Sequence, residues 1–407
     1  MFAQLRSLDH QQRSAVLASF LGWTLDAFDF FLLVFIIKDI ASQFHSDVTS
    51  VTFAILLTLA MRPLGAFIFG FFADRYGRRP TLMVDIVLYS ALEFATAFSP
   101  SLTVLIVLRA LYGVAMGGEW GIGASLALET VPPAARGIVS GILQEGYAVG
   151  YLLAALVYYF LYPLIGWRGM FMVGVLPALL VLYIRIHVQE SPAWEPVRER
   201  QISPLAAIRG RWGLFIYVII LMTAFNFFSH GTQDLYPTFL EVQHKLSSYA
   251  VGIIAVVYNI GAILGGIVFG AWSERIGRRN AIGIAALLSL PIIPLWAFSA
   301  SPVLLAIGAF LMQFMVQGAW GIVPVHLNEL SPEGVRGTFP GFTYQLGNLL
   351  ASANATIQAS IAASNGGDYG RALAYVAGIV AICVAVLAWL GRERKGVRFG
   401  HVGSAAE

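Results

Sequence analysis

The chain has 407 residues, of which 58% are hydrophobic and 12% are charged, and its formal net charge is +3. Charged residues make up about 25% of an ordinary soluble domain, so this composition excludes a typical soluble protein and indicates a membrane protein. The small net charge gives no case for nucleic-acid binding, and the single cysteine, Cys383, excludes an intrachain disulfide and a cysteine-based metal cluster.

Apolar runs of about 20 residues follow one another along the chain, and each can cross about 30 Å of hydrocarbon as a helix. We expect no cleavable signal peptide, because the first run is long and no small-residue cleavage site follows it. The sequence predicts twelve membrane helices, in the ranges 14–38, 49–72, 81–98, 102–128, 137–161, 168–188, 212–236, 249–272, 281–299, 303–328, 338–361 and 371–391.

Lys and Arg are distributed unevenly between the two ends of these helices. With the N-terminus inside, the inner segments hold 19 of the 25 basic residues, and the outer segments hold four. Basic residues collect on the cytoplasmic side of multi-pass proteins. The bias therefore predicts an integral protein of the cytoplasmic (inner) membrane with both termini in the cytoplasm.

The first two expected helices carry buried charge of both signs. Asp26 and Asp29 are three residues apart and project to one side of the first helix. Arg62 lies 12 residues before Asp74, which places it about 18 Å from the end of the second helix, near mid-membrane. Its guanidinium is a fork shaped for a carboxylate. Both a substrate contact and a structural ion pair with one of the two aspartates remain open, and the two can alternate.

Further ionisable residues fall inside the helices that follow. Arg109 is such a residue in the fourth expected helix, and opposite charge and burial act in opposite directions on a carboxylate near it. Glu119 and Glu145 are both weaker candidates, with Glu145 as a second proton site in the lower cavity, whereas Glu93 is interpreted as structural.

The seventh expected helix has one polar face. At 100° per residue, Asn226, Ser229, His230, Gln233 and Asp234 fall within an arc of about 140°. An ionisable group at this depth costs at least about 2.5 kcal/mol on insertion scales and marks a functional site. His230 and Asp234 are one turn apart and suit a proton relay, with simple packing of the histidine as the alternative.

The chain also repeats itself at an offset of 200 residues. The run GFFADRYGRR at Gly70–Arg79 recurs as GAWSERIGRR at Gly270–Arg279. Such repeats around a midplane site are typical of secondary transporters. We therefore expect a six-helix bundle at 1–188, a cytoplasmic linker at 189–211, and a second six-helix bundle with a short tail at 212–407.

These features resemble the major facilitator superfamily. The two G-x-x-x-D/E-R-x-G-R-R loops match its best-known motif, and Arg109–Gly117 matches its fourth-helix pattern R-x-x-x-G-x-x-x-G. The resemblance covers the whole chain and implies an all-α membrane protein of twelve helices in two pseudo-symmetric bundles. It also implies a conformational latch made by Gly70, Asp74, Arg75, Gly77, Arg78, Glu129, Arg136, Gly270, Glu274, Arg275, Gly277, Arg278, Glu329 and Arg336.

The seventh helix narrows the resemblance. Asn226–Thr238 reads N-x-x-S-H-x-T-Q-D-x-x-x-T and is similar to the signature of Jen-type lactate/pyruvate:proton symporters, in the sialate:proton symporter branch. That family also uses a second-helix arginine and an eleventh-helix glutamine and asparagine. The resemblance implies substrate binding by Arg62, Asn226, His230, Gln233, Gln345 and Asn348. Similar symporters pair a first-helix carboxylate with the fourth-helix arginine, which implies a pair of Asp29 with Arg109 that either couples protons or is a fixed structural pair. The proton-coupling candidates are then Asp26, Asp29, Arg109, Asp234, Glu145 and Glu119.

The expected function is therefore import of a short monocarboxylate such as lactate or pyruvate with a proton, by alternating access. The alternatives are symport of another organic anion such as sialate, an aromatic acid or a dicarboxylate, a sodium-coupled or uncoupled carrier, and a non-transporting carboxylate sensor. No nucleotide-binding G-x-x-x-x-G-K-[S/T] loop occurs in the sequence. We expect no enzyme activity, no cofactor, no metal and a monomer in the bilayer.

Overall fold

The computed structural model describes residues 2–198 and 209–400. Within these residues every assigned element is helical. The middle of the expected linker, 199–208, lies outside the described residues, so the linker's limits stay a prediction.

The N-terminal bundle begins with a very long helix whose start is capped. Asp9 accepts a hydrogen bond from the backbone of Gln12, whose side chain bonds back to Asp9, and this reciprocal cap satisfies two backbone donors. Gly166, at φ 61°, interrupts α8 where the chain reverses between the fifth and sixth expected helices. The elements are α1 (Phe2–Arg6), α2 (His10–Gln43), α3 (Val48–Tyr76), α4 (Arg78–Thr96), α5 (Leu102–Met116), α6 (Glu119–Thr130), η1 (Pro133–Ala135), α7 (Arg136–Gln144), α8 (Gly146–Val173), α9 (Ala178–His187) and, in the linker, α10 (Glu195–Arg198).

The C-terminal bundle repeats this order with more interruptions. Prolines stand at the starts of several short segments, where a missing N–H costs least. The elements are α12 (Trp212–Gln233), α13 (Tyr236–Thr238), η2 (Phe239–Gln243), α14 (Ser248–Ile276), α15 (Arg278–Leu288), η3 (Leu290–Ile292), α16 (Ile293–Phe298), α17 (Pro302–Trp320), α18 (Val323–Leu330), α19 (Phe339–Ala351), α20 (Asn354–Ser364) and α21 (Tyr369–Leu390).

Helix occupies each of the twelve expected ranges. In the part of the chain that is described, nine helical stretches are long and apolar enough by themselves to cross a membrane. The three expected ranges outside this set are 81–98, where α4 contains acidic residues, 168–188, where α9 is short, and 338–361, where a break separates α19 from α20.

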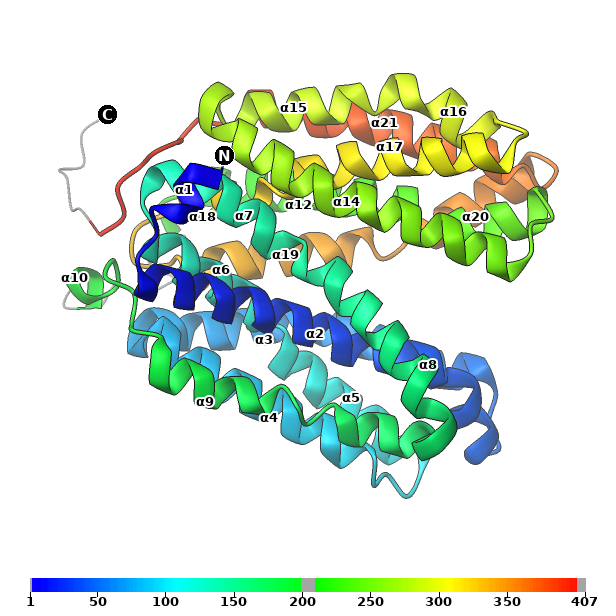
Figure 1. Cartoon of the computed structure of the whole chain (residues 1–407), viewed down its shortest axis with the longest axis horizontal. Coiled ribbons are helices and arrows are strands. Elements are labelled where there is room, and N and C mark those ends of the chain that lie inside the picture. Colours follow the sequence, from blue (N-terminus) through cyan, green and yellow to red (C-terminus); the bar gives the residue numbers. More distant parts are fainter. Residues whose placement is uncertain (1, 199–208, 401–407) are drawn as a thin grey trace.

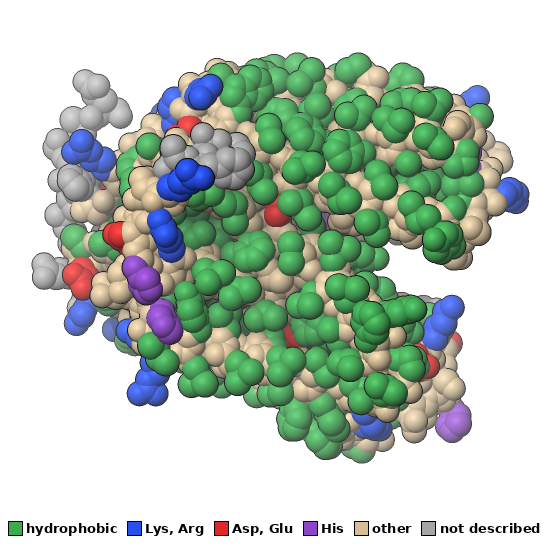
Figure 2. Space-filling model, in the orientation of Figure 1, with side chains coloured by type: hydrophobic (Ala, Val, Ile, Leu, Met, Phe, Trp, Pro, Cys, Tyr) green, Lys and Arg blue, Asp and Glu red, His purple; other side chains and the backbone are tan. Residues whose placement is uncertain are grey.

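The outer surface is apolar around the middle of the molecule. Large hydrophobic side chains midway along their helices, such as Ile220 and Ile379, are 49% and 64% exposed, and Figure 2 shows apolar side chains over the flanks of both bundles, with most Lys and Arg side chains near the two ends. An exposed apolar surface of this extent fits contact with lipid.

The two bundles meet at one end of the molecule, which we call the motif end because it carries the turns at Gly77 and Gly277. There α7 packs against α14, and α19 packs against α3 (Figure 1). The α7–α14 contact is a backbone contact, since a Cβ on Gly141 would lie 2.3 Å from the carbonyl oxygen of Gly266. At the opposite end, the open end, a cleft enters between the bundles (Figure 2).

Candidate functional site

A cavity of about 330 Å³ lies between the two bundles. Its walls come from α2, α3, α7 and α8 on one side and from α12, α14, α17 and α19 on the other. The lining residues are Trp23, Phe30, Phe31, Leu59, Arg62, Gln144, Glu145, Tyr147, Ala148, Tyr151, Asn226, Ser229, His230, Gln233, Asp234, Tyr258, Asn259, Ala262, Gln317, Trp320, Tyr344 and Asn348.

The polar face expected on the seventh helix forms one wall of this cavity. Asn226, Ser229, His230, Gln233 and Asp234 all line it, because α12 stays helical to Gln233 and so keeps the one-face spacing. Beyond that point the helix is broken into α13 and the π-helical turn η2.

His230 stands at the centre of a hydrogen-bonded group that joins two helices. Its Nδ1 lies 3.1 Å from Asp234 Oδ1, and its Nε2 lies 3.2 Å from Asn348 Oδ1 on α19. With both oxygens accepting, both ring nitrogens donate, which is the arrangement of a protonated imidazole. With the Asn348 amide turned over, a neutral ring fits the same positions. The group therefore accommodates the ring with or without the extra proton.

Arg62 lies on the opposite wall. Its Nη2 donates to Asp26 Oδ2 at 3.2 Å, its guanidinium lies 6.0 Å from the centre of the Trp23 ring, and the residue is 3% exposed. Among the described residues that line the cavity it is the one arginine. A carboxylate entering from the open end thus meets a guanidinium whose present partner is another carboxylate.

Arg109 does not form the expected pair with Asp29. It contacts Glu93 of α4 and lies 3.8 Å above the Tyr112 ring. The reason is packing: α4 lies against α5 and brings Glu93 to Arg109. Within the described part of the chain, neither oxygen of Asp29 has a hydrogen-bond partner. Glu93, interpreted as structural, is thus the residue that holds Arg109.

The other predicted residues divide between the cavity and the protein interior. Glu145 lines the cavity at the α7–α8 junction, and a Cβ on Gly266 of the opposite bundle would lie 2.0 Å from its Oε1. Glu119 is fully buried and Gln345 is 1% exposed, and neither lines the cavity. Asn348, one turn further along α19, lines the cavity, whereas Gln345 lies behind the cavity wall.

Several cavity residues were not expected from the sequence. The Tyr147 ring stacks on Trp23 at 5.7 Å, and Tyr151 packs edge-on to Phe31 at 4.8 Å, which gives the first bundle an aromatic wall. Polar Asn259 and Gln317 belong to this group too. The internal repeat could have identified these two amides as cavity residues. Asn259 is equivalent to Leu59 and Gln317 to Gly117, so each is polar where the first half is not.

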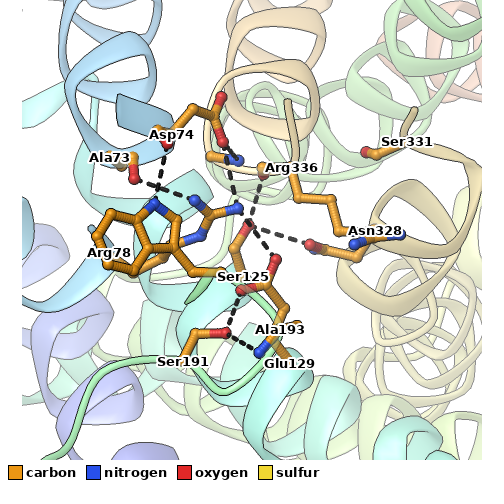
Figure 3. Close-up of polar contacts among 12 residues, drawn as sticks. Ala73, Asp74, Arg78, Ser125, Glu129, Ser191, Ala193, Asn328, Ser331 and Arg336 are labelled. Atoms are coloured by element: carbon orange, nitrogen blue, oxygen red, sulfur yellow. Dashed lines mark hydrogen bonds and ion pairs between the residues drawn. The ribbon is translucent and has the colours of Figure 1, made fainter. Parts of the chain in front are cut away.

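At the motif end, the first loop motif crosses between the bundles. Asp74 accepts hydrogen bonds from the backbone N–H groups of Gly337 and Thr338 at 2.8 and 2.9 Å, and from the Thr338 hydroxyl at 2.6 Å. Arg78 links Asp74 to Glu129, at 3.2 and 3.1 Å (Figure 3). A carboxylate placed at the start of α19 satisfies backbone donors that the helix leaves unpaired.

The second loop motif makes the equivalent contact in the opposite direction between the bundles. Glu274 Oε1 accepts from the backbone N–H of Gly137 at 2.6 Å, at the start of α7 in the other bundle. Arg278 joins Glu274 and Glu329 at 2.8 and 2.9 Å. Each motif carboxylate is therefore held by its own bundle and caps a helix of the opposite bundle.

Two members of the expected latch lie outside this network. Arg75 and Arg275 are exposed on the surface, and among the described residues their side chains form no ion pair with a carboxylate. The motif glycines at 77 and 277 have φ values of 113° and 94°, a conformation that strongly favours glycine and lets α3 and α14 turn at once into the next helix.

The segment that follows α21 lies across the motif end and contacts both bundles. Arg136 donates to the Val397 carbonyl oxygen at 2.6 Å, and the Gly396 N–H donates to Glu329 at 3.1 Å. The ring of Phe399, 8% exposed, lies 3.6 Å from the Arg136 guanidinium and 4.2 Å from that of Arg336. One aromatic side chain thus joins an arginine of each bundle.

No group of three or more His, Cys, Asp and Glu side chains suited to a metal ion occurs in residues 2–198 and 209–400. The polar groups that line the cavity are one guanidinium, the His230–Asp234 pair, the Glu145 carboxyl group, the Ser229 hydroxyl and several amides, together with aromatic rings.

Comparison with known proteins agrees with this architecture. The chain matches the family model described as Major Facilitator Superfamily over residues 19–247 and 235–401. It is 29% identical over 432 residues to the Carboxylic acid transporter protein homolog of Saccharomyces cerevisiae, covering 96% of this chain and 70% of that protein. It is 28% identical over 351 residues to the Sialic acid transporter NanX of Escherichia coli, covering 85% and 86%.

Solved structures show the same fold. The proton:xylose symporter XylE, bound to 6-bromo-6-deoxy-D-glucose, superposes with a TM-score of 0.78 at 18% identity, covering 96% of this chain and 98% of that one. The predicted all-α architecture of two pseudo-symmetric bundles is thereby confirmed.

Proposed function

We propose that this chain, which belongs to the major facilitator superfamily, imports a short monocarboxylate such as lactate or pyruvate together with a proton. The observation that carries this proposal is the arrangement of the cavity walls. Arg62, already paired with a carboxylate, lines the cavity opposite the His230–Asp234 pair and Asn348. A small acid anion with an α-hydroxyl or keto oxygen matches both walls at once.

The proposed cycle begins with the cleft open on the outer side. The substrate carboxylate takes the place of Asp26 at the Arg62 fork, and Asp26 takes up a proton when it loses its cationic partner. The amides of Asn226, Gln233 and Asn348 hold the second oxygen of the substrate. Anion and proton enter together, so the loaded cavity gains no net charge and the bundles can close over it.

The proposed placement in the membrane follows the charge distribution. The motif end carries the arginine-rich turns, so it faces the cytoplasm and the cleft opens to the outside of the cytoplasmic (inner) membrane. The bundles then exchange access by parting at the motif end and closing at the open end, in one chain that works as a monomer.

Uptake of labelled L-lactate into proteoliposomes with an imposed inward proton gradient tests the proposal. We expect gradient-dependent accumulation that a protonophore abolishes and that pyruvate inhibits by competition. Liposomes containing Arg62→Ala protein serve as the control for binding at the proposed site. Accumulation that persists after the proton gradient collapses contradicts proton coupling and favours a sodium-coupled or uncoupled carrier.

A second candidate substrate is a larger organic anion such as sialate or an aromatic acid. The cavity volume of about 330 Å³ and the aromatic wall of Trp23, Tyr147 and Tyr151 leave room for one. The relative NanX is named a sialic acid transporter. Gradient-driven sialate uptake in the absence of lactate uptake selects this candidate. Binding of carboxylates without any transport selects the sensor instead.

A further inference from the structure

The α4 helix carries a row of ionisable side chains inside the N-terminal bundle, away from the cavity. Asp85, Tyr89 and Glu93 follow one another at intervals of four residues and are all 0% exposed. None of them lines the cavity. Because residues four apart lie on one helix face, this row extends about 12 Å along the inside of the bundle.

The charges in this bundle interior do not balance if every group is ionised. Five carboxylates, those of Asp26, Asp29, Asp85, Glu93 and Glu119, are buried there with two arginines, Arg62 and Arg109. The arginines contact Asp26 and Glu93. The remaining three carboxyl groups, those of Asp29, Asp85 and Glu119, have no hydrogen-bond partner among the described residues. A buried, unpaired carboxylate is far less costly when it holds a proton than when it is charged.

The groups that face Asp85 from neighbouring helices are also acidic. Asp26 on α2 and Glu119 on α6 lie within electrostatic range of it, and Glu119 in turn lies near Arg62. No arginine contacts Asp85 itself within the described residues. Its surroundings therefore favour the neutral, protonated acid.

Two tyrosines provide an independent observation. The hydroxyl groups of Tyr89 and Tyr112 are fully buried, and neither has a hydrogen-bond partner among the described residues. Their rings pack edge to face at 6.3 Å, and Tyr89 lies within electrostatic range of Asp26, Asp29 and Glu119. A hydroxyl both donates and accepts, so Tyr89 can hand a proton between Glu119 on α6 and Asp29 on α2.

We propose that Asp85 stores a proton and that Asp85, Glu119, Tyr89 and Asp29 form a proton path inside the N-terminal bundle, separate from the substrate cavity. At Tyr89, the carboxylic O–H of Glu119 gives its proton to the tyrosine oxygen while Tyr89 releases its own proton to the Asp29 carboxylate. One O–H bond breaks and one forms at each oxygen pair, and no other reactant is needed. The path rests on the proposed proton symport, and it connects the Glu93–Arg109 pair with the region of Asp26.

Infrared spectroscopy of the full-length protein in liposomes tests the stored proton directly. The carbonyl band of protonated carboxylic acids is compared between wild type, Asp85→Asn and the control Asp47→Asn. Asp47 is exposed before α3, and hydrogen bonds from Ser50 lower its pKa, so it is ionised at neutral pH. We expect Asp85→Asn to lose part of the band and Asp47→Asn to keep it. Identical bands in all three proteins overturn the proposal.

Transport measurements test the path itself. We expect Asp85→Asn and Tyr89→Phe to reduce proton-driven accumulation at least about tenfold while exchange of labelled for unlabelled substrate changes little. Asp85→Glu, which keeps the acid, should restore accumulation. Equal loss of both activities in Tyr89→Phe, or full accumulation by Asp85→Asn, contradicts the path. If wild type itself ignores the proton gradient, the proposed symport fails, and the infrared comparison still decides whether Asp85 holds a proton.

Discussion

Arg62 shows how a single buried charge can be both stable and available. A lone guanidinium in the cavity wall would be costly, but Asp26 at 3.2 Å and the Trp23 ring offset much of that cost. The Asp26 carboxylate can be exchanged for a substrate carboxylate of the same charge. The His230–Asp234 pair on the other wall is more open, with side-chain exposures of 38% and 34%, so it can exchange protons with water in the cleft.

The substitution Arg62→Lys tests the role of the guanidinium fork. It keeps the charge but replaces two parallel donors by one compact ammonium, so we expect the uptake rate at low substrate concentration to fall at least about tenfold, the effect of losing one charge-assisted hydrogen bond. Initial uptake rates over a range of substrate concentrations measure it. Near-normal uptake removes Arg62 from carboxylate binding.

The substitution Asp234→Asn separates coupling from binding. It preserves a hydrogen-bonding side chain beside His230 but removes the negative charge, so we expect proton-driven accumulation to fall more than anion exchange across the membrane. Both activities are measured in the same proteoliposomes. If the two fall equally, the residue contributes to folding or binding instead. The substitution Asn259→Asp, which adds a charge elsewhere in the cavity, controls for a general change in cavity electrostatics.

At the scale of elements, the two bundles touch through glycines where helices cross. Gly141 on α7 meets the Gly266 carbonyl of α14, and Gly70 on α3 meets the backbone of Thr338, where a Cβ would lie 2.5 Å from the Thr338 Cα. These close crossings keep the motif end shut in this structure. Larger side chains there must push the bundles apart.

The substitution Gly141→Leu is therefore expected to favour the state that is open at the motif end. Overpacking of a close contact costs about 1–3 kcal/mol, enough to change the ratio of two states about tenfold or more. The measurement is the rate at which a membrane-impermeant maleimide labels Tyr151→Cys protein, in a Cys383→Ser background, from outside intact cells. We expect slower labelling.

The control is Gly252→Leu on α14, because a Cβ at Gly252 meets nothing within 4 Å. This variant should label at the wild-type rate. If Gly141→Leu also labels at the wild-type rate, the α7–α14 crossing does not set the balance between the two states.

For the whole molecule, closure of one end depends on contacts made twice. Asp74 and Glu274 each cap a helix of the opposite bundle, and the segment after α21 adds a further contact between the bundles. Phe399 lies between Arg136 of one bundle and Arg336 of the other. When the bundles part, the ring must leave at least one of these arginines.

The substitution Phe399→Ala should thus weaken closure of the motif end. Each cation–π contact contributes about 0.5–2 kcal/mol, so we expect a severalfold shift toward the state open at that end. The same cysteine-labelling assay reports the shift as slower labelling from outside. Arg398→Ala, which removes an exposed neighbour, serves as the matched control. Equal labelling rates in the two variants would show that the tail does not hold the bundles together.

The polar face of α12 could be predicted from the sequence because it depends only on local geometry. A helix repeats every 3.6 residues, so the spacing of Asn226, His230 and Asp234 already places them on one side. The repeat at 200 residues likewise predicted the two bundles and the loop motifs, since each motif acts through a turn a few residues long. The repeat also predicted that the two cavity walls differ, because the position equivalent to Arg62 in the second half is an alanine.

The partners of buried groups could not be predicted in this way, because they depend on which helices pack together and at what rotation. Arg109 contacts Glu93 and not Asp29, Gln345 lies behind the cavity wall, and Arg75 stays on the surface. Periodicity says which residues share a face of one helix. Only the tertiary structure decides what that face meets, since the arrangement of neighbouring helices is set by side-chain packing along the whole length of both bundles.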